Sequence, residues 1–281
     1  MSAWLNAEPF GWEDIVDVAL REDIGTGDIS AAAMPEGRLV DWYIEAQAPG
    51  TVCGLGIVES LFEPTSEFES LEVLASDGEV VVPGTMVAKG RMDARNALQF
   101  ERTALNFLMH LSGIATATAQ YVALVQGTRA KIADTRKTLP GLRLLQKYAV
   151  RCGGGSNHRM GLYDAVMIKD NHIRANGSIT SAVQALRGTV GHLIKIEVEC
   201  ESEGQVIEAI QSKADVVMLD NMAPVEMARI VSAHAGKTVF EASGGINLTT
   251  VRPVAESGVD IISVGAITHS VIALPFHLEL T

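Results

Sequence analysis

Six short apolar runs recur along the second half of the chain, and each is followed by a polar or glycine-rich turn and a stretch with helical spacing. The runs start near residues 132, 166, 194, 216, 239 and 261, so successive starts lie 34, 28, 22, 23 and 22 residues apart. Each gap accommodates one strand and one helix, which predicts a parallel sheet with helices outside it. A closed or nearly closed barrel of the TIM type fits this repeat best, with a doubly wound open sheet as the alternative. The segment AVRC at 149–152 is a candidate for a seventh strand.

The residues before this repeat show a different pattern. Residues 12–21 place apolar side chains three and four positions apart, which predicts an amphipathic helix. Residues 40–93 contain short alternating runs separated by Pro-Gly and Asp-Gly turns, which predicts a mainly antiparallel sheet. A helical pattern follows from residue 95 to about 111, and we expect Gly113 to end it and a second helix to reach about residue 125.

Charge is distributed unevenly along the chain. Residues 129–174 hold ten Lys and Arg against three Asp, a local charge of +7 in a chain of −12, so the remaining residues total −19. A cationic segment in an acidic chain favours a small, multiply anionic ligand over nucleic acid.

The sequence also lacks an apolar run of about 18 residues and a secretory signal, so we expect a cytoplasmic protein with no membrane partner. Cys53, Cys152 and Cys200 are far apart, which predicts buried free thiols rather than disulfides or a zinc site.

Polar or charged residues stand at nearly every predicted strand end. They are Asp134, Lys169, Glu199, Asp220, the Ser-Gly-Gly turn from 243 and the Val-Gly-Ala turn from 264. Because the carboxyl ends of barrel strands converge on one face, we expect the active site there. The alternative is that these charges only solvate the starts of loops.

The chemistry of these residues divides into two groups. Glu199 and Asp220 suit a Mg²⁺ that keeps several waters, or hydrogen bonds from ribose hydroxyls. The late glycine turns suit a phosphate, because backbone N–H groups can approach it without a side chain in the way. Arg136, Lys137, Arg159 and Lys169 form a cationic group that suits carboxylates. The predicted ligands are therefore a carboxylated molecule and a phosphorylated one.

The two histidines near this cationic group have different expected roles. His158 is a candidate for a general acid or base, or for a donor that positions a ligand. His172 is expected to make a structural hydrogen bond. The chain has no GxSxG elbow, no P-loop and no GxGxxG opening a βαβ unit, so hydrolase, P-loop NTPase and Rossmann dehydrogenase functions lack support.

Seven segments, in order along the chain and together spanning residues 20–270, resemble the quinolinate phosphoribosyltransferase family, also called nicotinate-nucleotide pyrophosphorylases (carboxylating). They read LREDIGTGD, ERTALNFL, DTRKTLPGLRLLQKYAVRCGGGSNHRMGLYDAVMIKDNH, EVE, VMLDNM, FEASGGI and DIISVGAITHS. The resemblance implies an incomplete TIM-like α/β barrel with an N-terminal α/β sandwich domain. We place the sandwich at 1–113, with the tail 270–281 packing back onto it, and the barrel at 114–269. It also implies a homodimer, or a higher homo-oligomer, in which the first domain of one subunit covers the barrel mouth of the other.

The same resemblance implies roles for individual residues. Lys137, Lys169, Glu199 and Asp220 are implied to be catalytic. The quinolinate site is implied to consist of Thr135, Arg136, Lys137, His158, Arg159 and Lys169, with Arg102 reaching in from the neighbouring subunit. The phosphoribosyl pyrophosphate site is implied to consist of Glu199, Asp220, Ser243, Gly244, Gly245, Val264, Gly265 and Ala266. Glu199 and Asp220 are implied to hold Mg²⁺, directly or through water. Leu139, where the family often has Thr, is one departure, and Arg143, Lys147 and Arg151 are expected to be structural.

The implied activity is that of a pentosyltransferase in NAD biosynthesis. Quinolinate and phosphoribosyl pyrophosphate would give nicotinate mononucleotide, CO₂ and pyrophosphate. The alternatives are the molybdenum-transport-associated pyrophosphorylase-like relative, a Mg²⁺-dependent barrel enzyme of another reaction class, a Schiff-base aldolase using Lys169, and a non-catalytic phosphoribosyl sensor.

Overall fold

The computed structural model describes residues 11–281, and these fall into two compact units. Unit 1 holds the described residues up to Ala119 together with Thr138–Gly154 and Ile267–Thr281. Unit 2 holds Gln120–Lys137 and Gly155–Ala266.

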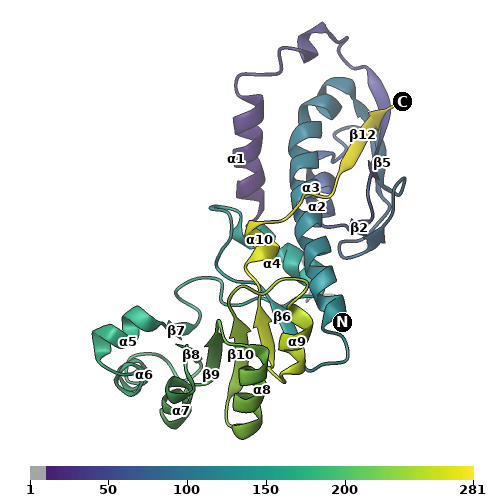
Figure 1. Ribbon diagram of the computed structural model, residues 1–281. Helices are drawn as coiled ribbons and strands as arrows, with labels where there is room; N and C mark the ends of the chain where they lie inside the picture. The colour runs from purple at the N-terminus through teal and green to yellow at the C-terminus, as the bar shows by residue number, and fades with distance from the viewer. Residues whose placement is uncertain (1–10) are drawn as a thin grey trace. The chain divides into compact units, whose positions relative to one another are not determined.

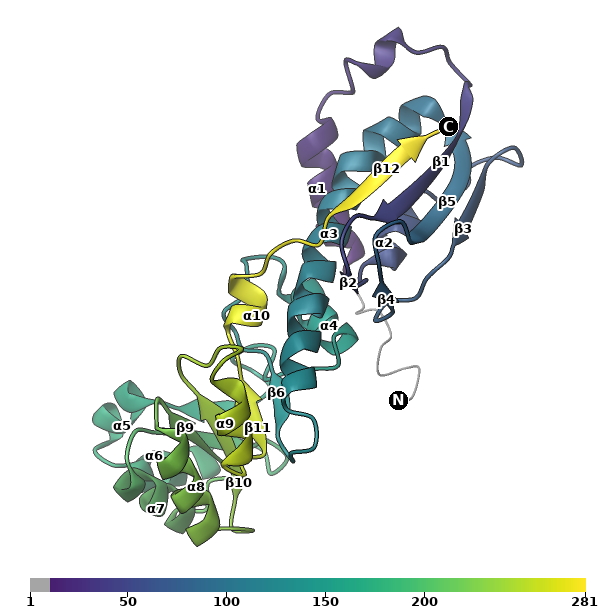
Figure 2. The same cartoon turned by 45° about the vertical axis from the view of Figure 1, so that its right-hand side comes forward.

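Unit 1 is built on an antiparallel sheet with the strand order β12-β1-β5-β3, which can be followed in Figure 2. The strands are β1 (Leu39–Ala46), β3 (Ser70–Val73), β5 (Met86–Asp93) and β12 (Phe276–Leu280). The antiparallel sheet predicted for residues 40–93 is confirmed. Strand β12 from the C-terminal tail pairs with β1, with Trp42 opposite Leu280. A two-stranded ladder, β2 (Gly50–Thr51) with β4 (Val80–Val81), accompanies the larger sheet.

The helices of unit 1 differ from the sequence prediction at two places. The helix predicted at 12–21 is confirmed as α1 (Glu13–Ile24), which is followed by the short helix η2 (Ala31–Ala33) and by α2 (Leu55–Leu61). The predicted break at Gly113 is wrong, because α3 runs unbroken over Ala94–Leu124. A β-carbon at Gly113 would lie 2.4 Å from the backbone oxygen of Ile272. The glycine therefore lets another segment approach the helix closely, and it does not end it.

The candidate strand at 149–152 is also wrong, because these residues form the last turn of α4 (Arg143–Cys152). Leu145, Tyr148, Ala149 and Cys152 are among its buried residues, and their spacing of three and four is that of a helix face. A four-residue apolar run does not by itself distinguish a strand from such a face. Arg143, Lys147 and Arg151 lie on this helix, as expected for residues outside the strand ends.

Unit 2 is built on a parallel sheet with the order β6-β11-β10-β9-β8-β7. The strands are β6 (Lys131–Ala133), β7 (Val166–Ile168), β8 (Ile196–Cys200), β9 (Val216–Asp220), β10 (Val239–Ser243) and β11 (Ile261–Ser263). From β7 to β11, strands that follow one another in sequence are neighbours in the sheet. Strand β6, the first of this unit, pairs with β11, the last, as in a barrel left open between β6 and β7. A doubly wound sheet would place its first strand inside the sheet instead. The predicted incomplete barrel is confirmed.

The connecting helices of unit 2 lie beside these strands in Figure 1. They are α5 (Asp170–Asn176), α6 (Ile179–Arg187), α7 (Glu203–Gln211), α8 (Pro224–Ala233) and α9 (Val251–Glu256), and α10 (Ala266–His269) follows the last strand. Within residues 11–281, no helix combines the length and the apolar composition needed to cross a membrane. All three cysteines are buried and free, as predicted.

The two faces of the parallel sheet differ in chemistry. On one face Val198, Val217 and Ala242 are fully buried. Because successive side chains of a strand point to opposite faces, Glu197 and Glu199 of β8 share the other face. On β9 and β10 this second face carries Met218, Asp220, Glu241 and Ser243, since Met218 is in register with both Glu199 and Glu241 and Asp220 with Ser243. The polar residues of three strands are thereby directed to one side.

Candidate active site

A cavity of about 540 Å³ lies in unit 2 where the strands end on this polar face. We call it the strand-end pocket. It is lined by Thr135, Arg136, Lys137, His158, Arg159, Met167, Lys169, Glu199, Met218, Asp220, Asn221, Ser243, Gly244, Gly245 and Ser263. Its volume falls in the range of small-molecule sites.

The strand-end pocket contains most of the residues singled out from the sequence, and four lie outside its lining. Arg102 is on α3 in unit 1, is exposed, and contacts Glu101 at 3.3 Å. Val264 is buried and donates its backbone N–H to Ala133. Gly265 and Ala266 follow it at the start of α10. Met167, Met218, Asn221 and Ser263 line the pocket and were not predicted.

The cationic side of the pocket comes from two loops. Thr135 follows β6 closely, and its Oγ1 accepts a hydrogen bond of 3.0 Å from the backbone N–H of Lys137. Arg159 donates from Nη1 to the backbone oxygen of Ala165 at 3.0 Å. Burial, and then the charge of Arg136, lower the pKa of Arg159 from its usual value. Two guanidinium groups therefore stand close enough to repel each other, which favours an anionic ligand between them.

Lys169 stands at the N-cap of α5, where its backbone N–H donates to Nδ1 of His172 at 3.0 Å. The structural hydrogen bond expected for His172 is confirmed. The ammonium group of Lys169 forms an ion pair with the carboxylate of Glu199 from the next strand. A member of the cationic group and a member of the acidic group thus meet inside the pocket.

Asp220 is held by the residue that follows it. Its Oδ2 accepts a hydrogen bond of 2.6 Å from Nδ2 of Asn221. Asn221 has a φ of 54°, in the left-handed region that residues other than glycine rarely adopt, and its backbone N–H donates to Ser243. Such a conformation persists only where its surroundings hold it, and Asn221 is therefore part of the built pocket.

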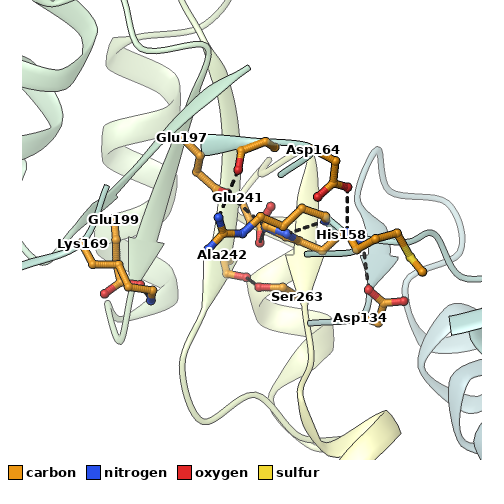
Figure 3. Close-up of polar contacts among 12 residues, drawn as sticks. Asp134, His158, Asp164, Lys169, Glu197, Glu199, Glu241, Ala242 and Ser263 are labelled. Carbon is orange, nitrogen blue, oxygen red and sulfur yellow. Dashed lines mark hydrogen bonds and ion pairs between the residues drawn. The ribbon is translucent and has the colours of Figure 1, made fainter. Parts of the chain in front are cut away.

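Two buried glutamates lie next to the pocket and close around His158 (Figure 3). The Nε2 atom of His158 lies 3.0 Å from Glu197 Oε2 and 3.5 Å from Glu241 Oε1. We call Glu197, His158 and Glu241 the acid–histidine cluster. Burial and the charge of Glu197 raise the pKa of Glu241 to about 7, while His158 opposes this rise.

The loop that carries His158 is fastened by a third buried acid. Asp134, just after β6, accepts hydrogen bonds from the backbone N–H of His158 at 2.9 Å and from Asn157 Nδ2 at 2.6 Å. Glu197 and Glu241 were not singled out in the sequence, although each stands two residues before a predicted site residue, Glu199 or Ser243. That spacing places it on the same face of its strand and is a usable signal.

The potential metal ligands of the described residues form two groups of three or more. One is Cys53, Asp77 and Cys152 in unit 1, and the other is the acid–histidine cluster. Neither includes Glu199 or Asp220. Glu199 and Asp220 are instead the two carboxylates of the pocket lining.

Comparisons with known proteins agree over nearly the whole chain. The family model "Quinolinate phosphoribosyl transferase, N-terminal domain" matches residues 28–112, and the model for the C-terminal domain matches residues 114–279. The probable nicotinate-nucleotide pyrophosphorylase (carboxylating) of Bacillus subtilis strain 168 is 42% identical over 260 residues, covering 92% of this chain and 90% of the relative. The nicotinate-nucleotide pyrophosphorylase (carboxylating) of Mycobacterium leprae strain TN is 40% identical over 275 residues, covering 95% and 96%.

Solved structures give the same result. The crystal structure of nicotinate-nucleotide pyrophosphorylase from Ehrlichia chaffeensis is similar at a TM-score of 0.93 and 40% identity, over 97% of this chain and 99% of that one. NadC from Streptococcus pyogenes is similar at a TM-score of 0.93 and 38% identity, over 98% of each chain.

Proposed function

This chain belongs to the quinolinate phosphoribosyltransferase family, and from that premise we propose how its strand-end pocket carries out the reaction. The protein transfers the phosphoribosyl group of phosphoribosyl pyrophosphate to quinolinate with loss of CO₂. The products are nicotinate mononucleotide, CO₂ and pyrophosphate, and the reaction is a step of NAD biosynthesis. The observation that supports this function is one cavity lined by Arg136, Arg159 and Lys169 and also by Glu199 and Asp220. A dicarboxylate and a metal-bound pyrophosphate need these two kinds of group side by side.

On the quinolinate side, Arg136, Arg159 and Lys169 bind the two carboxylates, with Thr135, Lys137 and His158 alongside. A guanidinium can hold a carboxylate through two parallel hydrogen bonds, and an ammonium acts as a point charge. The nearness of Arg136 to Arg159 supports this assignment, because an anion between them removes their mutual repulsion. Arg102 would join this side from the neighbouring subunit of a homodimer.

On the phosphoribosyl side, Glu199 and Asp220 would hold Mg²⁺ and the ribose, while Ser243, Gly244 and Gly245 would face the 5′-phosphate. Val264, Gly265 and Ala266 belong to the same phosphate-binding side. Two carboxylates in an open pocket fit Mg²⁺, which retains waters and takes its other ligands from a phosphorylated substrate. When bound, Mg²⁺ neutralises charge on the departing pyrophosphate. Gly244 and Gly245 have φ values of 94° and 61°, which leaves their backbone exposed to a phosphate without a side chain between.

The chemistry needs no protein nucleophile. The pyridine nitrogen of quinolinate is unprotonated near neutral pH and can attack C1 of the ribose directly. Lys137 and Lys169 stabilise negative charge as pyrophosphate leaves, and the cationic side keeps the ring in line with C1. The quaternary nitrogen formed in this step then stabilises the carbanion left when the adjacent carboxylate departs as CO₂, and a proton from water at that carbon gives nicotinate mononucleotide.

The ion pair of Lys169 with Glu199 argues against the Schiff-base alternative. A lysine that forms an imine presents its Nζ atom to a carbonyl carbon, whereas the Nζ atom of Lys169 is taken up by the carboxylate of Glu199. Borohydride trapping with a carbonyl substrate should therefore leave Lys169 unmodified.

Further parts of the proposal concern the organisation of the protein. We propose a homodimer in which residues 1–113 form the domain that covers the barrel of the partner, and residues 114–269 form the catalytic domain. A cytoplasmic location is supported by three buried cysteines that remain free thiols, as is usual in a reducing compartment.

One assay tests the function. Purified protein is supplied with quinolinate, phosphoribosyl pyrophosphate and Mg²⁺, and CO₂ and nicotinate mononucleotide are followed. The parallel reaction contains nicotinate in place of quinolinate. We expect turnover with quinolinate only, and turnover with nicotinate alone would refute the decarboxylating reaction. Binding of phosphoribosyl pyrophosphate without turnover would indicate a sensor, and an active protein that rejects quinolinate would indicate the molybdenum-associated relative or another Mg²⁺-dependent barrel enzyme.

A further inference from the structure

Both ring nitrogens of His158 have polar neighbours in the structure. On one side, Nε2 lies 3.0 Å from Glu197 Oε2 and 3.5 Å from Glu241 Oε1. On the other side, Nδ1 accepts a hydrogen bond of 2.8 Å from the backbone N–H of Arg159. A nitrogen that accepts a hydrogen bond from an N–H carries no proton of its own. The ring proton of His158 therefore resides on Nε2 and faces the two glutamates.

In this arrangement the single ring proton of His158, on Nε2, faces the glutamates and is not available to a ligand. Protonating Nδ1 would direct its new N–H at the N–H of Arg159 and break that hydrogen bond. Removing the Nε2 proton would leave a ring nitrogen facing two buried carboxylates. Removing the Nε2 proton is unfavourable beside Glu197 and Glu241, which are 6% and 2% exposed, and protonating Nδ1 costs the hydrogen bond from Arg159.

The cluster connects two strands of the barrel to a residue of the cationic side. Glu197 lies on β8 and Glu241 on β10, so the ring is held from two separate strands. The ring in turn holds the backbone of Arg159, whose guanidinium is held at Ala165 by Nη1. Sites that act on a bound ligand need their contacting groups held in place by supporting hydrogen bonds of this kind.

Building on the proposed function, we propose that Glu197 and Glu241 are positioning residues that act through His158 on Arg159, and that His158 neither gives nor accepts a proton in the reaction. His158 then contributes to quinolinate binding by fixing Arg159. This separates its role from that of a general acid or base, which the sequence left open.

The first test compares substitutions that keep or remove one hydrogen bond. Glu197→Gln retains an oxygen that can accept from Nε2 of His158, whereas Glu197→Met has a similar length and no acceptor. We expect Glu197→Met to raise the quinolinate KM about tenfold, the worth of one hydrogen bond, and Glu197→Gln to raise it less than about threefold. Both should keep kcat within about threefold of the unchanged protein. Equal KM values for the two variants would overturn the positioning role.

The second comparison is made at His158 itself. His158→Asn retains an oxygen near the position of Nδ1 for the N–H of Arg159, and His158→Gln retains an amide near the position of Nε2 for the glutamates. Each should raise the quinolinate KM with little change in kcat. A fall of kcat by about a hundredfold or more in both, with KM unchanged, is the behaviour of a lost general acid or base and would overturn the proposal.

A measurement on the unchanged protein keeps the proposal testable even if a variant does not fold. With ¹⁵N-labelled histidine, NMR distinguishes a ring nitrogen that carries a proton from one that does not, and the signals of His158 are assigned by their shift in Glu241→Gln. We expect a protonated Nε2 and an unprotonated Nδ1 at the pH of the kinetic assays. Protons on both ring nitrogens, or a proton on Nδ1 alone, under those conditions would contradict the proposal. Failure of the quinolinate assay would refute the proposed function and leave this tautomer result standing.

Discussion

A β-carbon added to Gly244 would lie 2.2 Å from Oδ1 of Asn221, so the two residues can share the strand-end pocket only because one of them is glycine. Asn221 in turn donates to Asp220 at 2.6 Å. The glycine at 244 therefore does more than expose its backbone to a phosphate. It leaves room for the amide that orients a carboxylate assigned to Mg²⁺ and ribose.

Gly244→Ala should displace Asn221 and loosen Asp220. Loss of a hydrogen bond to a charged group is worth about 1.5 to 3 kcal/mol, so we expect the KM for phosphoribosyl pyrophosphate to rise about tenfold or more while the quinolinate KM changes little. Steady-state kinetics with each substrate varied in turn measures this. Gly236→Ala is the matched control, because Gly236 also has a positive φ of 75°, has no atom within 4 Å of an added β-carbon and is not part of the pocket lining. Identical effects at 244 and 236 would exclude the steric argument.

The side chain of Asn221 can be removed without changing its backbone. Glycine adopts the φ of 54° at this position without strain, so Asn221→Gly isolates the loss of the amide. Adding Gly244→Ala to Asn221→Gly should cost less than Gly244→Ala alone, because the alanine then meets only the backbone nitrogen at position 221, at 2.8 Å, and no longer the amide oxygen at 2.2 Å. Strictly additive effects in this double-mutant cycle would show that the two residues act independently.

Arg136→Ala should weaken quinolinate binding or abolish turnover. One charge-assisted contact is worth roughly 1.5 to 3 kcal/mol, and a guanidinium that binds a carboxylate through two hydrogen bonds reaches the upper end. The quinolinate KM is the measurement, and Arg143→Ala on α4 is a control that removes the same charge from a residue outside the pocket lining. Unchanged kinetics in Arg136→Ala would exclude its assignment to the dicarboxylate.

Glu199 and Asp220 should affect the other substrate. Asp220→Asn keeps the shape of the side chain and removes the charge, so we expect a higher KM for phosphoribosyl pyrophosphate and a higher Mg²⁺ requirement, with the quinolinate KM retained. Glu199→Gln should act in the same way and should also release Lys169 from its ion pair. A rise in the quinolinate KM alone would show that the two sides of the pocket are assigned to the wrong substrates.

The β/α repeat and the strand-end residues could be predicted from the sequence because both depend on local signals. A strand of Val216–Asp220 that ends on an acid is recognised from a few residues and the turn after it. The close approach of Ile272 to α3 at Gly113 could not be predicted, because Ile272 is distant in sequence. The pairing of Asn221 with Gly244 depends likewise on two loops whose nearness only the register of β9 and β10 creates.

The acid–histidine cluster shows the same limit at the site itself. Glu197 precedes Glu199 by two residues, so the sequence places both on one face of β8, but it does not show which other strand brings an acid opposite. Glu241 lies two strands away, beyond Met218 of β9. The environment that raises the pKa of Glu241 therefore arises only when the sheet has formed.

Stability should fall with rising pH in a way that depends on Glu241. Burial, followed by the charge of Glu197, raises the pKa of Glu241 to about 7, against opposition from His158 and Ser263. A raised pKa in the folded state means that the folded protein holds a proton which the unfolded chain releases at lower pH. The contribution of this proton to the free energy of unfolding is therefore complete below the ordinary glutamate pKa. It is lost as the pH rises through about 7, and it amounts to roughly 3 kcal/mol at most.

Thermal unfolding of the unchanged protein and of Glu241→Gln, followed between pH 5 and 8, checks this pH dependence. The unchanged protein should lose more of its Tm over this range than Glu241→Gln, which has no group to titrate there. Glu201→Gln removes an exposed carboxylate and should behave like the unchanged protein. Parallel curves for all three proteins would contradict a proton held by Glu241.

Arg102 provides the test of a shared active site. It is exposed on α3 in unit 1, whereas Lys169 lines the strand-end pocket of unit 2. We expect Arg102→Ala and Lys169→Ala each to be nearly inactive alone. If Arg102 serves the pocket of the partner subunit, a dimer of one chain of each kind has one site with both defects and one intact site. Random reassembly makes half of the dimers mixed, so about a quarter of full activity should return. If Arg102 serves its own chain, every site in the mixed dimer carries one defect and mixing restores nothing.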